Sequence, residues 1–202
     1  EEVELVEERL QGVLEAGDTV CLTGHLPRGL SVDMYNTLVQ LVRDQGGKAV
    51  LAAEGISFEI GLKVHPNIVS LRHNQLESLF NYPVRTVEDV AHSAANLCAR
   101  SGGSVVLVAH AELEYGMIVT ENQRWLATIP EAEQPTQGTT SGIHDAFLAG
   151  FLAHYRYSDD LAIALRWALG AATYTRLHPG NEFGTPQNVQ PYFDDVVISE
   201  ME

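Results

Sequence analysis

Apolar and polar residues along the chain form blocks that alternate between helical and extended patterns. Apolar side chains recur at helical spacing in the first fourteen residues, and a short apolar run of strand length follows. Residues 24–29 are rich in Gly and Pro and predict a loop, after which Ser31 and Asp33 can cap a further helix. The whole pattern predicts helices at 1–14, 34–45, 56–64, 73–80, 87–99, 144–155 and 159–177, strands at 19–23, 48–52, 67–71 and 104–109, and a hairpin of 116–120 with 124–128.

Strands that alternate with helices predict right-handed crossovers and a mostly parallel sheet covered on both faces. The hairpin is expected at one end of that sheet. No internal repeat, low-complexity tract or linker interrupts the pattern. We therefore expect a single layered α/β domain over residues 1–202.

Composition narrows the partners that the chain can have. Of 202 residues, 45% are hydrophobic and 19% are charged, which is typical of a globular domain. A net charge of −15 opposes binding to nucleic acid and to anionic membranes. The thiols of Cys21 and Cys98 are expected to be reduced. Without a leader or a long apolar run, a cytoplasmic location is expected, and the helical start without Met predicts a preceding segment.

The segment with the most chemical content is residues 138–151, a polar loop that contains Gly and runs into an apolar helix. The first turn of a helix offers unpaired N–H groups and a partial positive charge, which stabilise a phosphate. Thr140 adds a hydroxyl donor, and Asp145 can accept a proton from an attacking hydroxyl. Alternatively, Asp145 only complements the helix dipole and Thr140 only caps the helix.

Other chemical groups are scattered. The eight histidines lack the spacing of a metal site, so no metal ligand is directly assigned. Arg28, Lys63 and Arg72 are candidates to bind the phosphate of a substrate at the strand ends, and each is equally explained as an exposed charge.

Residues 139–151 resemble the signature Asn-Thr-x-Gly-Ala-Gly-Asp-Ala-Phe-x-Ala-Gly-Phe of the ribokinase/PfkB-type carbohydrate kinases, in the 1-phosphofructokinase-like branch. Residues 17–29 are similar to the family's strand followed by Ser-Gly-Ser-Leu-Pro-x-Gly, and residues 165–180 to its small-residue helix and Gly turn. The resemblance covers nearly the whole chain and corresponds to the C-terminal two thirds of a member. It implies a three-layer ribokinase-like sandwich whose N-terminal strands and lid are absent from this chain.

The resemblance also implies the parts of a site. Asp145 would be the general base, with an anion hole formed by Gly142, Ile143, His144 and Thr140. ATP and Mg²⁺ would be the cofactors, and a sugar or sugar phosphate the small-molecule partner. The residues implied to border the nucleotide are Ala109, His110, Ala111, Gly116, Ala171 and Gly180. The oligomeric state stays open, a homodimer included, because the lid that commonly pairs subunits is absent.

The sequence departs from the family pattern at several of these positions. His144 stands where the second glycine of Gly-Ala-Gly-Asp is expected. Arg72 and Gln75 replace the Asn and Glu of Lys-Pro-Asn-x-x-Glu, on the substrate or metal side, and Ala52 replaces an Asp. Two hypotheses follow: an ATP-dependent kinase of a sugar or sugar phosphate, and a catalytically silent kinase-like module that binds a ligand or acts as a scaffold.

Overall fold

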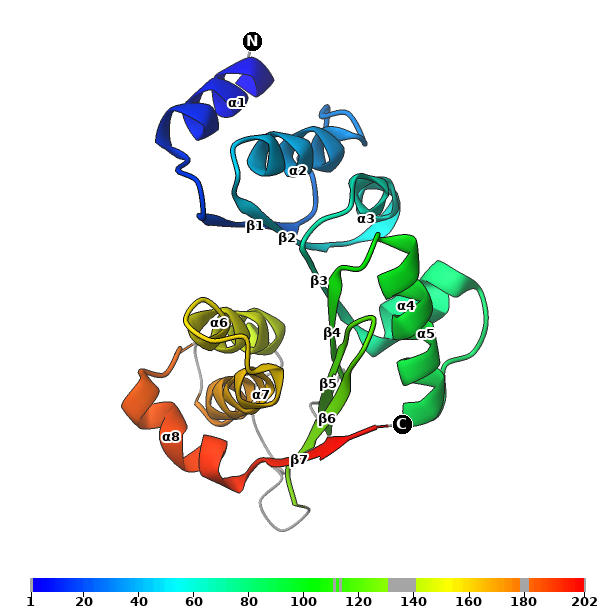
Figure 1. The fold of residues 1–202 in the computed structure, drawn as a ribbon, viewed down its shortest axis with the longest axis vertical. Coiled ribbons are helices and arrows are strands. Elements are labelled where there is room, and N and C mark those ends of the chain that lie inside the picture. The colour runs from blue at the N-terminus through cyan, green and yellow to red at the C-terminus, as the bar shows by residue number, and fades with distance from the viewer. Residues whose placement is uncertain (1, 111, 113, 131–140, 179–181, 202) are drawn as a thin grey trace.

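The computed structural model describes residues 2–110, 112, 114–130, 141–178 and 182–201, which fold around one seven-stranded sheet (Figure 1). The strands are β1 (Thr19–Gly24), β2 (Lys48–Ala53), β3 (Ile68–Arg72), β4 (Val105–Ala109), β5 (Tyr115–Val119), β6 (Arg124–Thr128) and β7 (Val197–Glu200). The helices are α1 (Glu2–Val13), α2 (Met34–Asp44), α3 (Gly55–Gly61), α4 (His73–Phe80), α5 (Val87–Arg100), α6 (Ile143–Tyr155), α7 (Leu161–Leu177) and α8 (Pro186–Asp195).

The strands lie in the sheet in their order along the chain. β1 to β4 pair in parallel, and β4 to β7 pair in antiparallel. In the parallel part, Gly24 pairs with Ala53 and Arg72 pairs with Ala109. The carboxyl ends of these four strands therefore meet along one edge of the sheet, which is the usual place of ligand sites in parallel α/β folds.

Helices cover both faces of the sheet and make three layers (Figure 1). α2 to α5 pack on one face of the sheet, and α1 packs against α2. α6 and α7 pack on the opposite face over β4 to β7, and α8 packs against α7. Each face has its own apolar core, with Leu51 and Val106 in the first and Leu107 and Phe147 in the second.

Local chemistry explains where several helices begin. The Thr86 hydroxyl accepts from the Asp89 N–H at the start of α5, and the Asp160 carboxylate accepts from the Ile163 N–H at the start of α7. Each bond satisfies a backbone donor that has no acceptor within its helix. α8 begins with Pro186, whose fixed φ suits the first turn of a helix.

The layered, mostly parallel α/β architecture is confirmed. The predicted hairpin is formed by β5 and β6 beside the parallel strands, but β7 pairs with β6 and occupies the end of the sheet where the hairpin was expected. The helix expected at 56–64 is two pieces, because α3 ends at Gly61 and a 3₁₀ turn covers Leu62–Val64. α8 and β7 were not predicted. Among the described helices, none combines the length and apolar character that crossing a membrane requires.

Candidate active site

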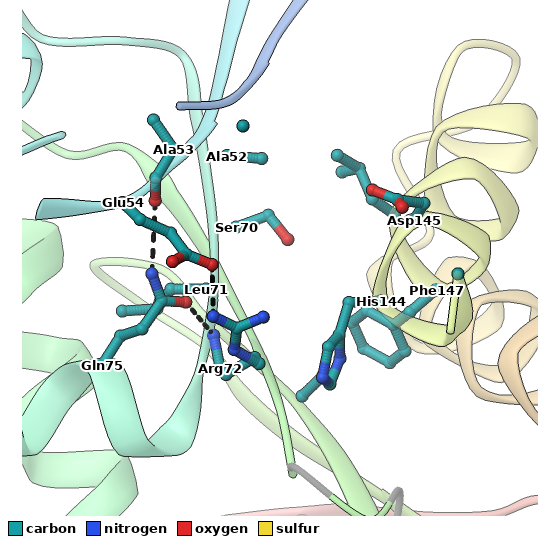
Figure 2. Close-up of a pocket in the computed structure, with 14 residues that line it drawn as sticks. Ala52, Ala53, Glu54, Ser70, Leu71, Arg72, Gln75, His144, Asp145 and Phe147 are labelled. Atoms are coloured by element: carbon teal, nitrogen blue, oxygen red, sulfur yellow. Dashed lines mark hydrogen bonds and ion pairs between the residues drawn. The ribbon is translucent and has the colours of Figure 1, made fainter. Parts of the chain in front are cut away.

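A cavity of about 270 Å³ lies between the carboxyl ends of the parallel strands and the first turn of α6 (Figure 2). Ala52 and Glu54 from the end of β2, and Ser70 and Arg72 from β3, line one wall. The opposite wall is the beginning of α6. The cavity therefore lies at the predicted phosphate-binding segment, and it joins that segment to strand ends more than sixty residues earlier.

The backbone at Gly142 explains how α6 enters the cavity. Gly142 has φ +74°, a left-handed conformation that favours glycine, and α6 begins at the next residue. Ile143 and Phe147 are buried in the core beneath the helix, which turns His144 and Asp145 toward the cavity. Ile143 can therefore bind an anion only through its backbone N–H.

Asp145 lies in the first turn of α6, where its side chain is exposed. Figure 2 shows its carboxylate on one side of the cavity and the Ser70 hydroxyl on the other. The first backbone N–H of this helix that bonds within it is that of Ala146, which donates to Gly142. The N–H groups before it have no acceptor inside the helix, so one turn holds both a carboxylate and backbone donors that the helix itself does not satisfy.

The opposite wall carries an ionic cluster formed by three strand ends. The Arg72 Nη2 donates to the Glu54 carboxylate, whose second oxygen lies 3.3 Å from the His25 Nε2. Side chains of Arg72 and Glu54 are each 34% exposed, so both remain accessible from the cavity. The cluster holds the Arg72 guanidinium at the carboxyl edge of the sheet.

Gln75 lines the cavity, but its amide is engaged with the backbone. Its Oε1 accepts from the Arg72 N–H at 2.7 Å, and its Nε2 donates to the Ala53 carbonyl at 3.2 Å. The first bond caps the start of α4, and the second ties that start to the end of β2. Both polar atoms of the Gln75 side chain thus have a structural role.

His144 lines the cavity, and its surroundings strongly lower the pKa of its imidazole. Burial, and secondly the positive charge of Arg72, lower its pKa to about 4, against smaller opposing effects of Asp145 and Glu54. The imidazole is therefore neutral at pH 7. Its Nδ1 is buried and has no hydrogen-bond partner among the described residues.

The residues implied to border a nucleotide do not all lie at the first cavity, and some are outside the described residues. Ala109 lines the cavity, whereas the neighbouring His110 ring stacks on His73 with centroids 4.5 Å apart. Gly116 lies in β5, where a Cβ would come within 2.5 Å of the Phe147 ring, so close packing accounts for this glycine. Three of the predicted site residues lie outside the described residues: Thr140, Ala111 and Gly180.

Ala171 lines a second, apolar cavity of about 200 Å³ between α6, α7 and α8. Its walls include Gly150, Trp167 and Phe183. The hydroxyl of Thr175 belongs to this lining and is buried with no partner in the described part of the chain. A flat apolar group with a polar edge fits such a surface.

Other predicted cations do not reach the first cavity. Arg28 and Lys63 are exposed and are absent from its lining. Glu54 and His25 were not predicted as site residues, although each directly follows a strand, and that position is the signal that could have found them.

No protein-family model matches the sequence. The chain is 24% identical over 188 residues to the 1-phosphofructokinase of Bacillus subtilis, covering 93% of this chain and 60% of the relative. It is 25% identical over 165 residues to the D-tagatose-1-phosphate kinase of Bacillus licheniformis, covering 81% of this chain and 53% of the relative.

Solved structures agree in fold. A putative phosphofructokinase from Staphylococcus aureus superposes with a TM-score of 0.87 at 22% identity, over 99% of this chain and 63% of that one. The ribokinase of Arabidopsis thaliana, solved with ribose and ATP, gives 0.72 at 19% identity, over 95% and 58%. The present chain therefore spans less than two thirds of the length of each of these proteins.

Proposed function

Because the chain is a relative of the ribokinase/PfkB-type carbohydrate kinases, in the 1-phosphofructokinase-like branch, we propose that its protein transfers a phosphoryl group to a sugar or sugar phosphate. ATP is the proposed donor. The observation that carries the proposal is the placement of Asp145, an exposed carboxylate in the first turn of α6 that faces a cavity at the carboxyl edge of the sheet.

In this proposal the Asp145 carboxylate accepts the proton of the sugar hydroxyl. The hydroxyl oxygen meanwhile forms a bond to the transferred phosphorus, and the bond from that phosphorus to the ADP oxygen breaks. The N–H groups of Ile143, His144 and Asp145 stabilise negative charge on the transferred group. Such donors are preorganised by the helix, so they need no rearrangement as charge develops.

The adenine of the nucleotide is proposed to occupy the second cavity. The surface of Ala171 and Trp167 is apolar, and the Thr175 hydroxyl, which has no partner among the described residues, offers one polar contact. Both features fit a purine, which has flat apolar faces and a polar edge. α6 separates this cavity from the first, so one helix would contact both ends of the donor.

A second candidate is a module that binds the same kind of ligand without turnover. The ion pair of Arg72 with Glu54, and His144 in the first turn of α6, favour it, because both place side chains where a reacting phosphoryl group would need space. The two candidates share the cavity and differ only in chemistry.

An ADP-release assay of the full-length protein with Mg-ATP and a panel of hexose phosphates separates them. We expect turnover, and we expect Asp145→Asn to lower kcat by about 10²- to 10⁴-fold, the usual contribution of a general base. Asp44→Asn is the matched control, since Asp44 is an exposed aspartate outside the cavity. A folded protein with no turnover on any hexose phosphate would support the binding module instead.

A further inference from the structure

We infer that the first cavity binds a phosphoryl group directly through Arg72, with no divalent cation held by the wall that β2, β3 and α4 form. The inference deepens the proposed function and rests on it only in placing a phosphoryl group in this cavity. It holds equally for a kinase and for a module without turnover.

Arg72 has donors left for a ligand. A guanidinium carries five N–H donors in a planar fork, and among the described residues its contact with Glu54 uses one nitrogen, Nη2. Figure 2 shows the guanidinium between the Glu54 carboxylate and the side of the cavity where His144 lies. Its remaining edge therefore faces the cavity, and an arginine fork matches the geometry of phosphate oxygens.

The same wall is a poor site for Mg²⁺. This ion needs oxygen ligands in near-octahedral geometry, and proteins usually supply one or two carboxylates. The carboxylate of Glu54 already shares its charge with Arg72 and lies beside His25, and the Gln75 amide is hydrogen bonded to the backbone at both ends. The cation of Arg72 would in addition repel the metal.

The opposite wall does not supply the missing ligands. Asp145 is the one further carboxylate among the described residues that line the cavity. In the described part of the chain, no three His, Cys, Asp or Glu side chains converge as a metal site requires. The Arg72 guanidinium suits an anion, and the Asp145 carboxylate that faces it suits a hydroxyl beside that anion. This pair is a poorer match for a hydrated Mg²⁺.

His144 is consistent with an anion in this place. Because its pKa is lowered to about 4, the ring is neutral at pH 7 and carries one N–H. Its Nδ1 is buried and lacks a partner among the described residues, so the ring would have to turn toward the cavity for this atom to donate to a ligand oxygen. Arg72 and His144 lie on opposite walls of one cavity, where each can contribute an N–H to the same anion.

Calorimetric titration of the full-length protein with inorganic phosphate tests the inference, once in EDTA and once in excess Mg²⁺. We expect the two dissociation constants to agree within about twofold, because no cation mediates the contact. Loss of charge-assisted hydrogen bonds in Arg72→Met should weaken binding by about tenfold or more. Arg9→Met removes the same charge from exposed Arg9 in α1 and should leave the dissociation constant unchanged.

Glu54→Gln distinguishes a direct role of Arg72 from misfolding. It removes the negative charge that offsets Arg72, so we expect phosphate to bind several-fold more tightly, whereas a damaged fold would bind more weakly. Equal affinity of Arg72→Met and the unchanged protein, or binding that disappears in EDTA, would overturn the inference. Failure of the proposed function alone would appear as phosphate binding without ADP release.

Displacement in EDTA then identifies the source of the phosphoryl group. If ATP displaces inorganic phosphate and a hexose phosphate does not, Arg72 contacts the donor. The reverse result assigns Arg72 to the acceptor. If neither displaces it, the phosphate site at Arg72 does not take part in the proposed reaction, and the inference is wrong.

Discussion

His144 is a half-buried, neutral imidazole at the second position of α6, and its environment has a measurable consequence for stability. Burial is the largest cause of its lowered pKa, and the Arg72 charge adds to it. The folded state thus resists protonation of this ring, whereas the unfolded chain accepts a proton near pH 6.5. The contribution of the neutral ring to the free energy of unfolding is fully present above about pH 6.5 and is lost as the pH falls toward about 4.

We predict that His144→Asn makes the protein less sensitive to acid. Between about pH 7 and pH 4, the free energy of unfolding should fall by about 3 kcal/mol less in the variant than in the unchanged protein. Urea unfolding at several pH values measures this difference. His92→Asn is the control, because His92 is exposed on α5. A variant with the same pH profile as the unchanged protein would show that His144 is accessible to protons in the fold.

At the scale of single residues, local sequence was sufficient for one wall of the cavity. A polar loop before an apolar helix predicted that Asp145 would lie in a first turn, and it does. The cluster of Arg72, Glu54 and His25 was not predictable in the same way. Its members stand at the carboxyl ends of three different strands, so only the parallel register brings them together.

At the scale of elements, the contact of α6 with α7 depends on the absence of a side chain at Gly150. A Cβ there would lie 2.6 Å from the Trp167 carbonyl oxygen and 2.8 Å from the Ala171 Cβ. The first of these atoms is backbone and cannot rotate away, so the helices would have to separate. α6 carries Asp145, and its axis positions the carboxylate in the cavity.

We therefore predict that Gly150→Ala destabilises the fold by about 1–3 kcal/mol, the usual cost of overpacking. Gly12→Ala is the matched control: nothing lies within 4 Å of its added Cβ, and alanine in a helix should stabilise it by about 0.5–1 kcal/mol. Thermal unfolding of both variants provides the measurement. Equal melting temperatures for the two variants would mean that α6 and α7 pack less tightly than described.

Hydrophobic periodicity predicted most elements because each buries one face. The stretch His73–Phe80 was predicted with its observed limits, and the hairpin strands nearly so. α8 was missed for a physical reason, since Pro191 lies within it and only Val189 is buried along its length. β7 is short and mostly exposed, and its pairing with β6 is a long-range choice that no local pattern records.

At the scale of the whole molecule, the first cavity lies where the two helical layers approach each other. α4 follows β3 on one face of the sheet, and α6 packs on the other face. A ligand held by Arg72 and by the first turn of α6 would therefore connect layers that have separate apolar cores. Its binding energy should appear as protection on both sides of the cavity at once.

We predict that saturating inorganic phosphate slows backbone hydrogen exchange in residues 53–55, 71–75 and 142–148 together. At about one hundred times the dissociation constant, a ligand adds about 2.7 kcal/mol to the stability of the segments that it closes, or about a hundredfold in exchange rate. α8, which lies outside the cavity lining, should not change. Protection confined to 142–148 would mean that the anion rests on the helix alone and that Arg72 faces it without binding it.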